Sequence, residues 1–235
     1  MRVRVAENIG FCFGVKRAMD MVEGLLAREG RLYILGELIH NKEVTDYLEE
    51  KGAVTVESVQ DVPEGARMVI RSHGAPPETY ALCESRGVRV TDATCPFVRR
   101  IHEIVAEQYR AGKVILIVGE AAHPECVGIN GCCGNSARFL SLPEEVWELP
   151  GGEDVCLVAQ TTASEALFER VEAELKKRFP QATVYNTICS TTRQRQKEAQ
   201  TLSETCSVML VIGSHNSSNT QKLIRVCEKG CKHVY

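Results

Sequence analysis

Residues 114–125 read VILIVGEAAHPE: five apolar residues followed by a polar turn that contains a histidine and a glutamate. Such a run is typical of a buried strand, and the turns after parallel strands are where ligands bind. Four further stretches repeat the pattern: LYILGELIHN (32–41), MVIRSHGAP (68–76), VCLVAQTTAS (155–164) and VMLVIGSHNSSN (208–219). Segments with helical spacing of apolar residues lie between them. This alternation predicts an α/β fold.

The same periodicities predict the individual elements. We expect strands over residues 2–6, 32–35, 69–72, 88–91, 114–118, 155–159, 183–185 and 208–212. Helical spacing of apolar residues is found from 18 to 26, 97 to 105 and 167 to 175. Polar side chains that follow predicted strands, and are therefore candidates for a ligand site, are His40, His73, His123, Thr161, Thr162, Ser217, Ser218 and Asn219.

The composition is that of an ordinary globular protein, with 44% hydrophobic and 25% charged residues among 235. The net charge is −3 and no run of Lys or Arg occurs, so we expect neither a nucleic-acid nor an anionic-membrane partner. The longest apolar runs fall far short of the roughly 20 residues of a membrane span. Since the N-terminus also has no signal-peptide core, we expect a cytoplasmic protein.

Three of the 11 cysteines share one sequence context. Cys12, Cys95 and Cys189 each precede a predicted helix with basic residues one turn further on, in CFGVKR, CPFVRR and CSTTRQR. A cysteine at a helix N-terminus near positive charge has a stabilised thiolate, which favours a metal ligand or a nucleophile. The remaining eight cysteines have no such context.

Three thiolates from distant segments could hold zinc, hold an iron–sulfur cluster, or be ordinary buried thiols. A closed zinc site usually has four ligands, often from Cys-x-x-Cys pairs, and no such pair occurs here. A 4Fe–4S cluster on three cysteines would leave one iron open to substrate as a Lewis acid. The histidines and hydroxyls after the strands would suit a phosphate-type anion.

Eight short motifs also occur in the order in which one known family has them. They are GFCFGVKRA (10–18), the His-Asn of LGELIHN, RSHGAP (71–76), DATCPFV (92–98), HPE (123–125), QTT (160–162), TICSTTRQRQ (187–196) and GSHNSSN (213–219). By this set the chain resembles the 4-hydroxy-3-methylbut-2-enyl diphosphate reductase family, the terminal enzymes of the non-mevalonate isoprenoid pathway. The match runs from residue 10 to residue 219.

The resemblance implies a trefoil of three α/β units around a central cluster. One 4Fe–4S cluster per chain would be held by Cys12, Cys95 and Cys189. We expect one compact domain with approximate units 13–95, 96–190, and 191–235 with 1–12. The family continues with a further strand beyond this point, so we expect the third unit to be incomplete at the C-terminus.

The resemblance also implies the substrate site. By the family pattern, the diphosphate would be held by His40, His73, Ser217, Ser218 and Asn219, with His123 beside it. Glu125 would be the proton source, Thr161 would position the substrate hydroxyl, and His123 would assist them.

The implied function is the reductive dehydroxylation of 4-hydroxy-3-methylbut-2-enyl diphosphate to isopentenyl and dimethylallyl diphosphate. Electrons would come from a carrier such as ferredoxin or flavodoxin. Two alternatives stay open. An iron–sulfur hydro-lyase would turn over without added electrons, and a non-catalytic metal-binding protein or truncated relic would bind metal without affinity for a diphosphate.

Overall fold

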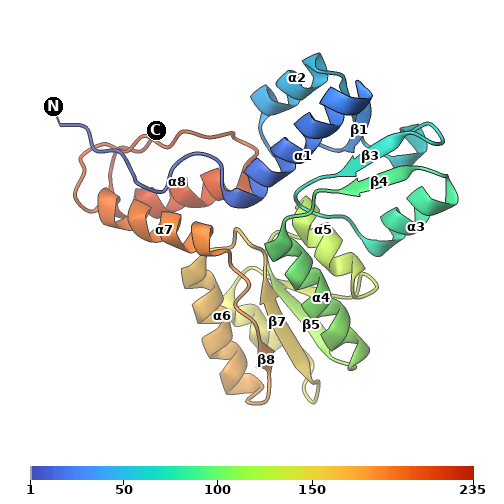
Figure 1. Ribbon diagram of the computed structural model, residues 1–235. Helices are drawn as coiled ribbons and strands as arrows, with labels where there is room; N and C mark the ends of the chain where they lie inside the picture. The colour runs from blue at the N-terminus through green and yellow to red at the C-terminus, as the bar shows by residue number, and fades with distance from the viewer. Residues whose placement is uncertain (1) are drawn as a thin grey trace.

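The computed structural model describes residues 2–235, and two parallel β-sheets form its framework (Figure 1). The first sheet has the order β2–β1–β3–β4 and consists of β1 (Leu32–Leu35), β2 (Ala53–Val56), β3 (Arg67–Ile70) and β4 (Arg89–Asp92). Side chains alternate between the two faces of β3. Val69 packs in the cluster formed with α1 and α2, whereas Met68 and Ile70 pack in the cluster that contains Cys83 of α3. This sheet is therefore buried on both faces, as parallel sheets usually are.

The second sheet repeats the arrangement with the order β6–β5–β7–β8. Its strands are β5 (Val114–Val118), β6 (Arg138–Leu140), β7 (Val155–Ala159) and β8 (Thr183–Val184). Leu116 and Val118 pack against Phe168 of α6, while Ile115 and Ile117 pack in the cluster of α4 and α5. The apolar run at 114–118 is thus a central strand, as its sequence indicated.

Helices connect the strands as crossovers. Those around the first sheet are α1 (Phe13–Glu29), α2 (Lys42–Glu50), the 3-10 helix η1 (Val59–Asp61) and α3 (Pro77–Ser85). Those around the second sheet are α4 (Pro96–Arg110), α5 (Pro124–Gly131), the 3-10 helix η2 (Pro143–Glu148) and α6 (Glu165–Arg178). Four of these eight begin with proline, whose fixed φ suits a first helical position and whose missing N–H is not needed there.

The remaining chain forms a third part of the structure, and the N- and C-termini both lie beside it (Figure 1). It contains α7 (Ser190–Ser203) and α8 (Ser218–Gly230), which pack on each other. The strands predicted at 2–6 and 208–212 are wrong. Residues 2–6 are irregular, and 208–212 pairs over a short stretch only, through three backbone hydrogen bonds to 233–235 around one isolated parallel bridge between Met209 and Val234. A strand needs a ladder partner along its length, which neither the alternation at 2–6 nor the apolar run at 208–212 provides.

Two edge strands, β2 and β6, were not predicted. Residues 143–148 form η2, whose Val146 is fully buried in the cluster of α6. The predicted α/β class with parallel sheets is confirmed. No helix in the described part of the chain is long and apolar enough to cross a membrane.

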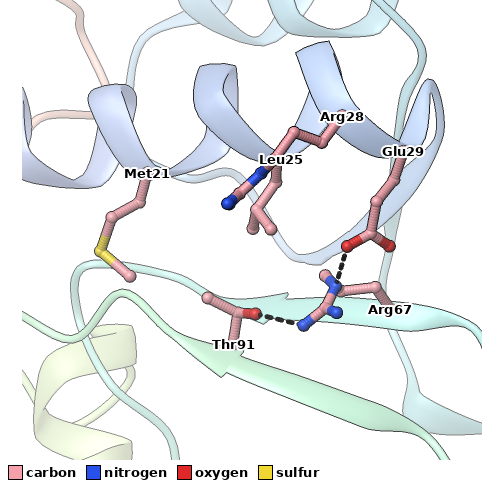
Figure 2. Close-up of a pocket in the computed structure, with 6 residues that line it drawn as sticks. All are labelled: Met21, Leu25, Arg28, Glu29, Arg67 and Thr91. Atoms are coloured by element: carbon pink, nitrogen blue, oxygen red, sulfur yellow. Dashed lines mark hydrogen bonds and ion pairs between the residues drawn. The ribbon is translucent and has the colours of Figure 1, made fainter.

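Parallel strands place the segments after β1 and β3 at one edge of the first sheet, and those after β5 and β7 at one edge of the second. These segments carry most of the candidate residues. A separate surface pocket of about 430 Å³ lies between α1 and the first sheet (Figure 2). There Arg67 bridges Glu29 at 2.5 Å and Thr91 at 3.1 Å, and none of the candidate residues lines it.

Candidate active site

Three cysteines stand immediately before helices, as predicted. Cys12, Cys95 and Cys189 are the N-cap residues of α1, α4 and α7. None of the three makes a side-chain capping hydrogen bond within the described chain. The positive end of each helix dipole favours negative charge at this position, and hence the thiolate.

The three thiols lie close together although they come from distant segments. A Cβ atom on Gly14 would lie 2.6 Å from Sγ of Cys95 and 4.0 Å from Sγ of Cys12, so this position must be glycine. Burial raises the pKa of the Cys95 thiol, and the neighbouring Cys12 and Cys189 thiols raise it further. A cradle of three soft sulfur donors fits a thiophilic metal or an iron–sulfur cluster.

The basic residues that follow the cysteines organise the surrounding backbone. Arg17 of α1 donates to the carbonyl of Thr94 at 3.2 Å, beside Cys95. Arg195 of α7 donates to the carbonyl of Gly10 at 2.5 Å, just before Cys12. Each of these guanidinium groups thus ties one cysteine-bearing segment to the helix of another.

Backbone hydrogen bonds connect the thiols to the candidate ligand-binding segments. The amide of Cys95 donates to the carbonyl of Ser72 at 2.9 Å, next to His73. The amide of Cys189 donates to the carbonyl of Thr161 at 3.0 Å. The cysteines and the turns after β3 and β7 therefore belong to one hydrogen-bonded unit.

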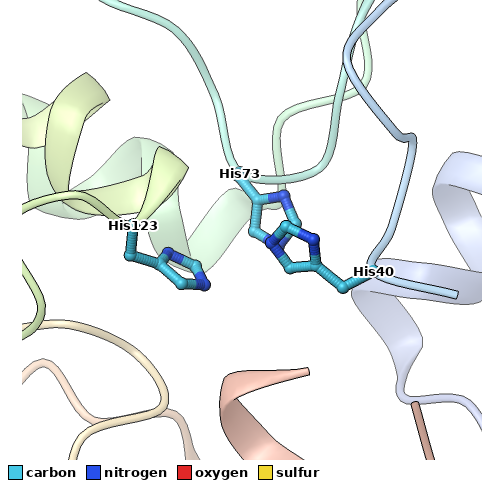
Figure 3. A group of neighbouring side chains, drawn as sticks. All are labelled: His40, His73 and His123. Carbon is cyan, nitrogen blue, oxygen red and sulfur yellow. The ribbon is translucent and has the colours of Figure 1, made fainter. Parts of the chain in front are cut away.

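Three histidines from three separate turns form a cluster (Figure 3). His40 follows β1, His73 follows β3, and His123 is the N-cap residue of α5. The ring centroids are 4.7 Å apart for His40 and His73, 5.4 Å for His40 and His123, and 5.3 Å for His73 and His123. One nitrogen of each ring lies within 4.8 Å of one nitrogen of both others. We call these residues the histidine triad.

Two members of the histidine triad, His73 and His123, are held neutral at pH 7. Burial lowers the pKa of His73 well below its usual range and lowers that of His123 to about 4, and His40 lowers both further. Nδ1 of His123 accepts from the amide of Glu125 at 3.2 Å, which leaves Nε2–H as the donor of the neutral ring. Nδ1 of His40 faces a carboxylate oxygen of Glu37 at 3.2 Å.

Two nitrogens of the histidine triad are buried without a partner within residues 2–235: Nε2 of His40 and Nδ1 of His73. A buried polar atom that lacks a hydrogen bond costs about 1–3 kcal/mol. The triad is therefore arranged to receive a polar ligand, and His123 presents an N–H to it.

Glu125 is a buried acid in the first turn of α5, with only 2% of its surface exposed. One carboxyl oxygen accepts from the amide of Thr161 at 2.5 Å, and the other contacts the Thr161 hydroxyl at 2.7 Å. Burial raises the pKa of Glu125 to about 7, against the lowering effect of these two bonds. A carboxyl with this pKa is a competent proton donor at neutral pH.

The residues at the start of α8 reach the same region through polar contacts. Ser218 Oγ lies 3.1 Å from the Thr162 hydroxyl and 3.5 Å from Nε2 of Gln160. Ser217 caps α8 by accepting from the amide of Thr220. Asn219 lies in the first turn of α8. The structure brings Ser218 next to Thr162, whereas no hydrogen bond or ion pair joins α8 to the histidine triad within residues 2–235.

Some residues of this region were not singled out from the sequence. Gln160 is fully buried and also accepts from the backbone amide of Glu120 at 3.1 Å. Glu120 forms an ion pair with Lys222 of α8. The QTT motif pointed to Gln160 only as a neighbour of the two threonines, and no local pattern indicates the pair between Glu120 and Lys222.

The cysteine-rich stretch beside Glu125 is part of the protein core. Cys126 and Cys133 are fully buried in the cluster of α4, β5 and β7, and Cys132 packs at its edge. Burial raises the pKa of all three thiols, that of Cys132 to about 12, so they are unreactive at neutral pH.

This combination of a three-thiol cradle, an imidazole cluster and a buried acid is typical of a metalloenzyme built on parallel α/β sheets. A family model described as LytB protein matches residues 3–235. The chain belongs to the LytB family.

Curated relatives support the same family. A protein of Caldanaerobacter subterraneus subsp. tengcongensis named 4-hydroxy-3-methylbut-2-enyl diphosphate reductase is 44% identical, and the alignment covers 100% of this chain and 83% of the relative. A relative of the same name from Clostridioides difficile is 41% identical over 97% of this chain and 83% of its own.

Two solved structures are similar to this one. The E-1-hydroxy-2-methyl-but-2-enyl-4-diphosphate reductase of Plasmodium falciparum superposes with a TM-score of 0.92 at 28% identity, covering 96% of this chain and 73% of the other. A structure of (E)-4-hydroxy-3-methyl-but-2-enyl diphosphate reductase, described as the terminal enzyme of the non-mevalonate pathway, gives a TM-score of 0.75 at 36% identity, covering 99% and 84%. The family resemblance drawn from the sequence motifs is confirmed, and with it the assignment to the iron–sulfur oxidoreductases.

Proposed function

We propose that this chain converts 4-hydroxy-3-methylbut-2-enyl diphosphate to isopentenyl and dimethylallyl diphosphate. The observation that carries the proposal is one hydrogen-bonded chain of groups. The carboxyl of Glu125 bonds to the hydroxyl and amide of Thr161, and the Thr161 carbonyl accepts from the amide of Cys189. A proton source, a hydroxyl-binding residue and a metal-ligand candidate are thereby held in fixed relation.

Cys12, Cys95 and Cys189 would hold one 4Fe–4S cluster at the centre of a trefoil of three units, 13–95, 96–190, and 191–235 with 1–12. When bound, such a cluster supplies single electrons and an iron that has no protein ligand. The support is the convergence of the three thiols at helix N-termini around Gly14.

The other residues would bind and orient the substrate. The histidine triad, with Ser217, Ser218 and Asn219, would hold the diphosphate, and Thr161 would bond to the C4 hydroxyl. Glu125 would protonate the departing oxygen, because hydroxide is a poor leaving group. The C4–O bond breaks, two electrons and two protons enter, water leaves, and the second proton adds to either of two allylic carbons.

The reaction needs an external one-electron donor, and we propose a ferredoxin- or flavodoxin-type carrier in the cytoplasm. The alternative of a hydro-lyase requires no donor. The test that separates the two reactions is to incubate the protein with the allylic diphosphate in the absence of oxygen, with and without a reduced carrier, and to analyse the products. Both five-carbon diphosphates should form only with the reductant, and turnover without it would indicate a hydro-lyase.

The cluster ligands are tested on protein reconstituted without oxygen. Cys12→Ser, Cys95→Ser and Cys189→Ser should each lower the bound iron and sulfide, whereas Cys206→Ser, outside the cradle, should not. Mössbauer spectra should contain one distinct iron site that changes when the allylic diphosphate is added. Zinc, or no metal after reconstitution, would overturn the proposal.

A further inference from the structure

Arg71 lies between the two turns that carry His40 and His73. It follows β3 directly, and its guanidinium packs against Gly36, the residue after β1. A side chain at position 36 would overlap Nη1 of Arg71, so this glycine leaves room for the guanidinium. The neighbouring Ser72 ties the two turns together, since its hydroxyl donates to the carbonyl of Leu38 at 3.0 Å.

The guanidinium of Arg71 has no hydrogen bond or ion pair within residues 2–235. Two acids, Glu37 and Glu57, are near enough to raise the Arg71 pKa, but neither forms an ion pair with it, and Glu37 bonds to His40 instead. Burial nonetheless dominates and lowers this pKa. Arg71 is half-buried, and a cation that is partly desolvated without a partner raises the free energy of the site. Arg71 is therefore set up to receive an anion.

The adjacent histidine triad lacks a permanent positive charge that could balance a bound anion. His73 and His123 are neutral at pH 7, and the positive charge of Arg71 contributes to lowering both of their pKa values. Beyond them, the Glu120 carboxylate is neutralised by Lys222. Neutral imidazoles can donate hydrogen bonds to a diphosphate, but they do not balance its several negative charges.

We propose that Arg71 is a diphosphate-binding residue that supplies a permanent positive charge beside the histidine triad. The inference rests on the proposed function in one respect, the identity of the anion. A guanidinium fork matches phosphate oxygens in geometry as well as in charge. The nearby Nε2 of His40 and Nδ1 of His73 lack partners, and the same diphosphate would accept hydrogen bonds from them.

The test uses calorimetric binding of methyl diphosphate to the cluster-loaded protein at pH 8, without turnover. Arg71→Gln should weaken binding about 10- to 100-fold, the usual range for a hydrogen bond to a charged group. Arg71→Lys keeps the charge but loses the guanidinium fork, so its affinity for methyl diphosphate should lie between those of the wild type and Arg71→Gln. The matched control is Arg110→Gln, which removes the same charge from the exposed end of α4, where Arg110 bonds only to the Ala106 carbonyl.

The outcomes separate this inference from the proposed function. Failure of the wild-type protein to bind methyl diphosphate would remove the proposed function itself. Wild-type binding that Arg71→Gln matches within twofold would overturn the role of Arg71 alone. A purely structural role would instead appear as a lower unfolding temperature with unchanged affinity in the folded protein.

A measurement on the wild-type protein covers the case in which Arg71→Gln does not fold. Above pH 8 methyl diphosphate is fully ionised and both His73 and His123 are neutral, so a permanent charge predicts an affinity that levels off between pH 8 and 9.5. A tenfold loss of affinity per pH unit throughout this range would mean that binding requires uptake of a proton, and would overturn a permanent charge on Arg71 as the source of the affinity.

Discussion

At the scale of single residues, Glu125 is a carboxyl whose environment holds a proton at neutral pH. Burial is the cause, since the two bonds from Thr161 act in the opposite direction. In a low-dielectric site the ionised form loses more hydration than two hydrogen bonds return. The acid required by the proposed reaction is thus a product of packing around α5.

The first prediction concerns proton delivery. Glu125→Gln keeps the shape and can still bond to the Thr161 hydroxyl, but it cannot release a proton. We expect turnover to fall by about 10²- to 10⁴-fold, the usual contribution of a general acid. The cluster spectrum of the variant, measured in parallel, should equal that of the wild type, and turnover close to the wild-type rate would exclude Glu125 as the acid.

The second prediction concerns stability against pH. Glu125 has a pKa of about 7 in the folded protein and an ordinary value of 4.5. Between these two pH values only the unfolded state releases the proton. The contribution of Glu125 to the free energy of unfolding is therefore full below pH 4.5 and is lost as the pH rises to 7. The loss amounts to about 3 kcal/mol, from 1.36 kcal/mol per pKa unit.

Urea unfolding of the wild type and Glu125→Gln between pH 4.5 and 8 measures this contribution. The free energy of unfolding of the wild type, minus that of Glu125→Gln, should fall between pH 4.5 and 7 and then level off. Because the histidines are common to both proteins, their own titration cancels. A difference that stays constant with pH would show that the Glu125 pKa is ordinary.

At the scale of elements, α7 anchors the segment that precedes Cys12. Arg195 donates to the carbonyls of Asn8 at 3.0 Å and of Gly10 at 2.5 Å, and Glu198 accepts from the amide of Glu7 at 2.5 Å. This segment has no strand of its own, so these side chains take the place of a ladder. The position of Cys12 therefore depends on a helix that lies almost 180 residues further along the chain.

The third prediction follows from this anchor. Arg195→Gln should release the segment around Gly10 and speed the loss of iron to a chelator about tenfold, as expected for about 1.4 kcal/mol of lost anchoring. Lys197→Gln, the same charge change at an exposed position of α7, is the control and should lose iron at the wild-type rate. Equal rates for both variants would show that Arg195 does not position Cys12.

At the scale of the whole molecule, α8 joins the second sheet through a few polar contacts. Lys222 pairs with Glu120, and Ser218 contacts Thr162 at 3.1 Å. The Lys222 side chain is 15% exposed and that of Glu120 is 54% exposed, so solvent screens this pair in part. The hydrogen bond from Lys222 is the main reason that the pKa of Glu120 is lowered.

The fourth prediction is that this pair holds the start of α8 in place. Lys222→Met should increase hydrogen exchange of the amides in the first turn of α8 by about tenfold, because local opening no longer breaks an ion pair. Exchange in the second sheet should not change. Lys229→Met, at the exposed end of the same helix, serves as the control, and equal exchange in both variants would contradict the role of Lys222.

The sequence by itself determined the α/β class, the central strands and the cysteines at helix starts. Strongly apolar runs such as 114–118 and helix-start signals such as Cys95-Pro96 are local, so no distant contact is needed to recognise them. The ordered motifs determined the family for the same reason. The identities of the candidate ligands also came from these motifs.

Only the tertiary structure decided which of these residues meet and in what state. The histidine triad spans both sheets, the Glu125 pKa depends on burial, and Arg71 lies against a glycine 35 positions away. Likewise, 2–6 alternates and 208–212 is apolar, as strands are, but neither forms a continuous ladder, because a strand exists only where a neighbour pairs with it along its length. Local pattern encodes the tendency of a segment, whereas pairing, burial and charge depend on distant parts of the chain.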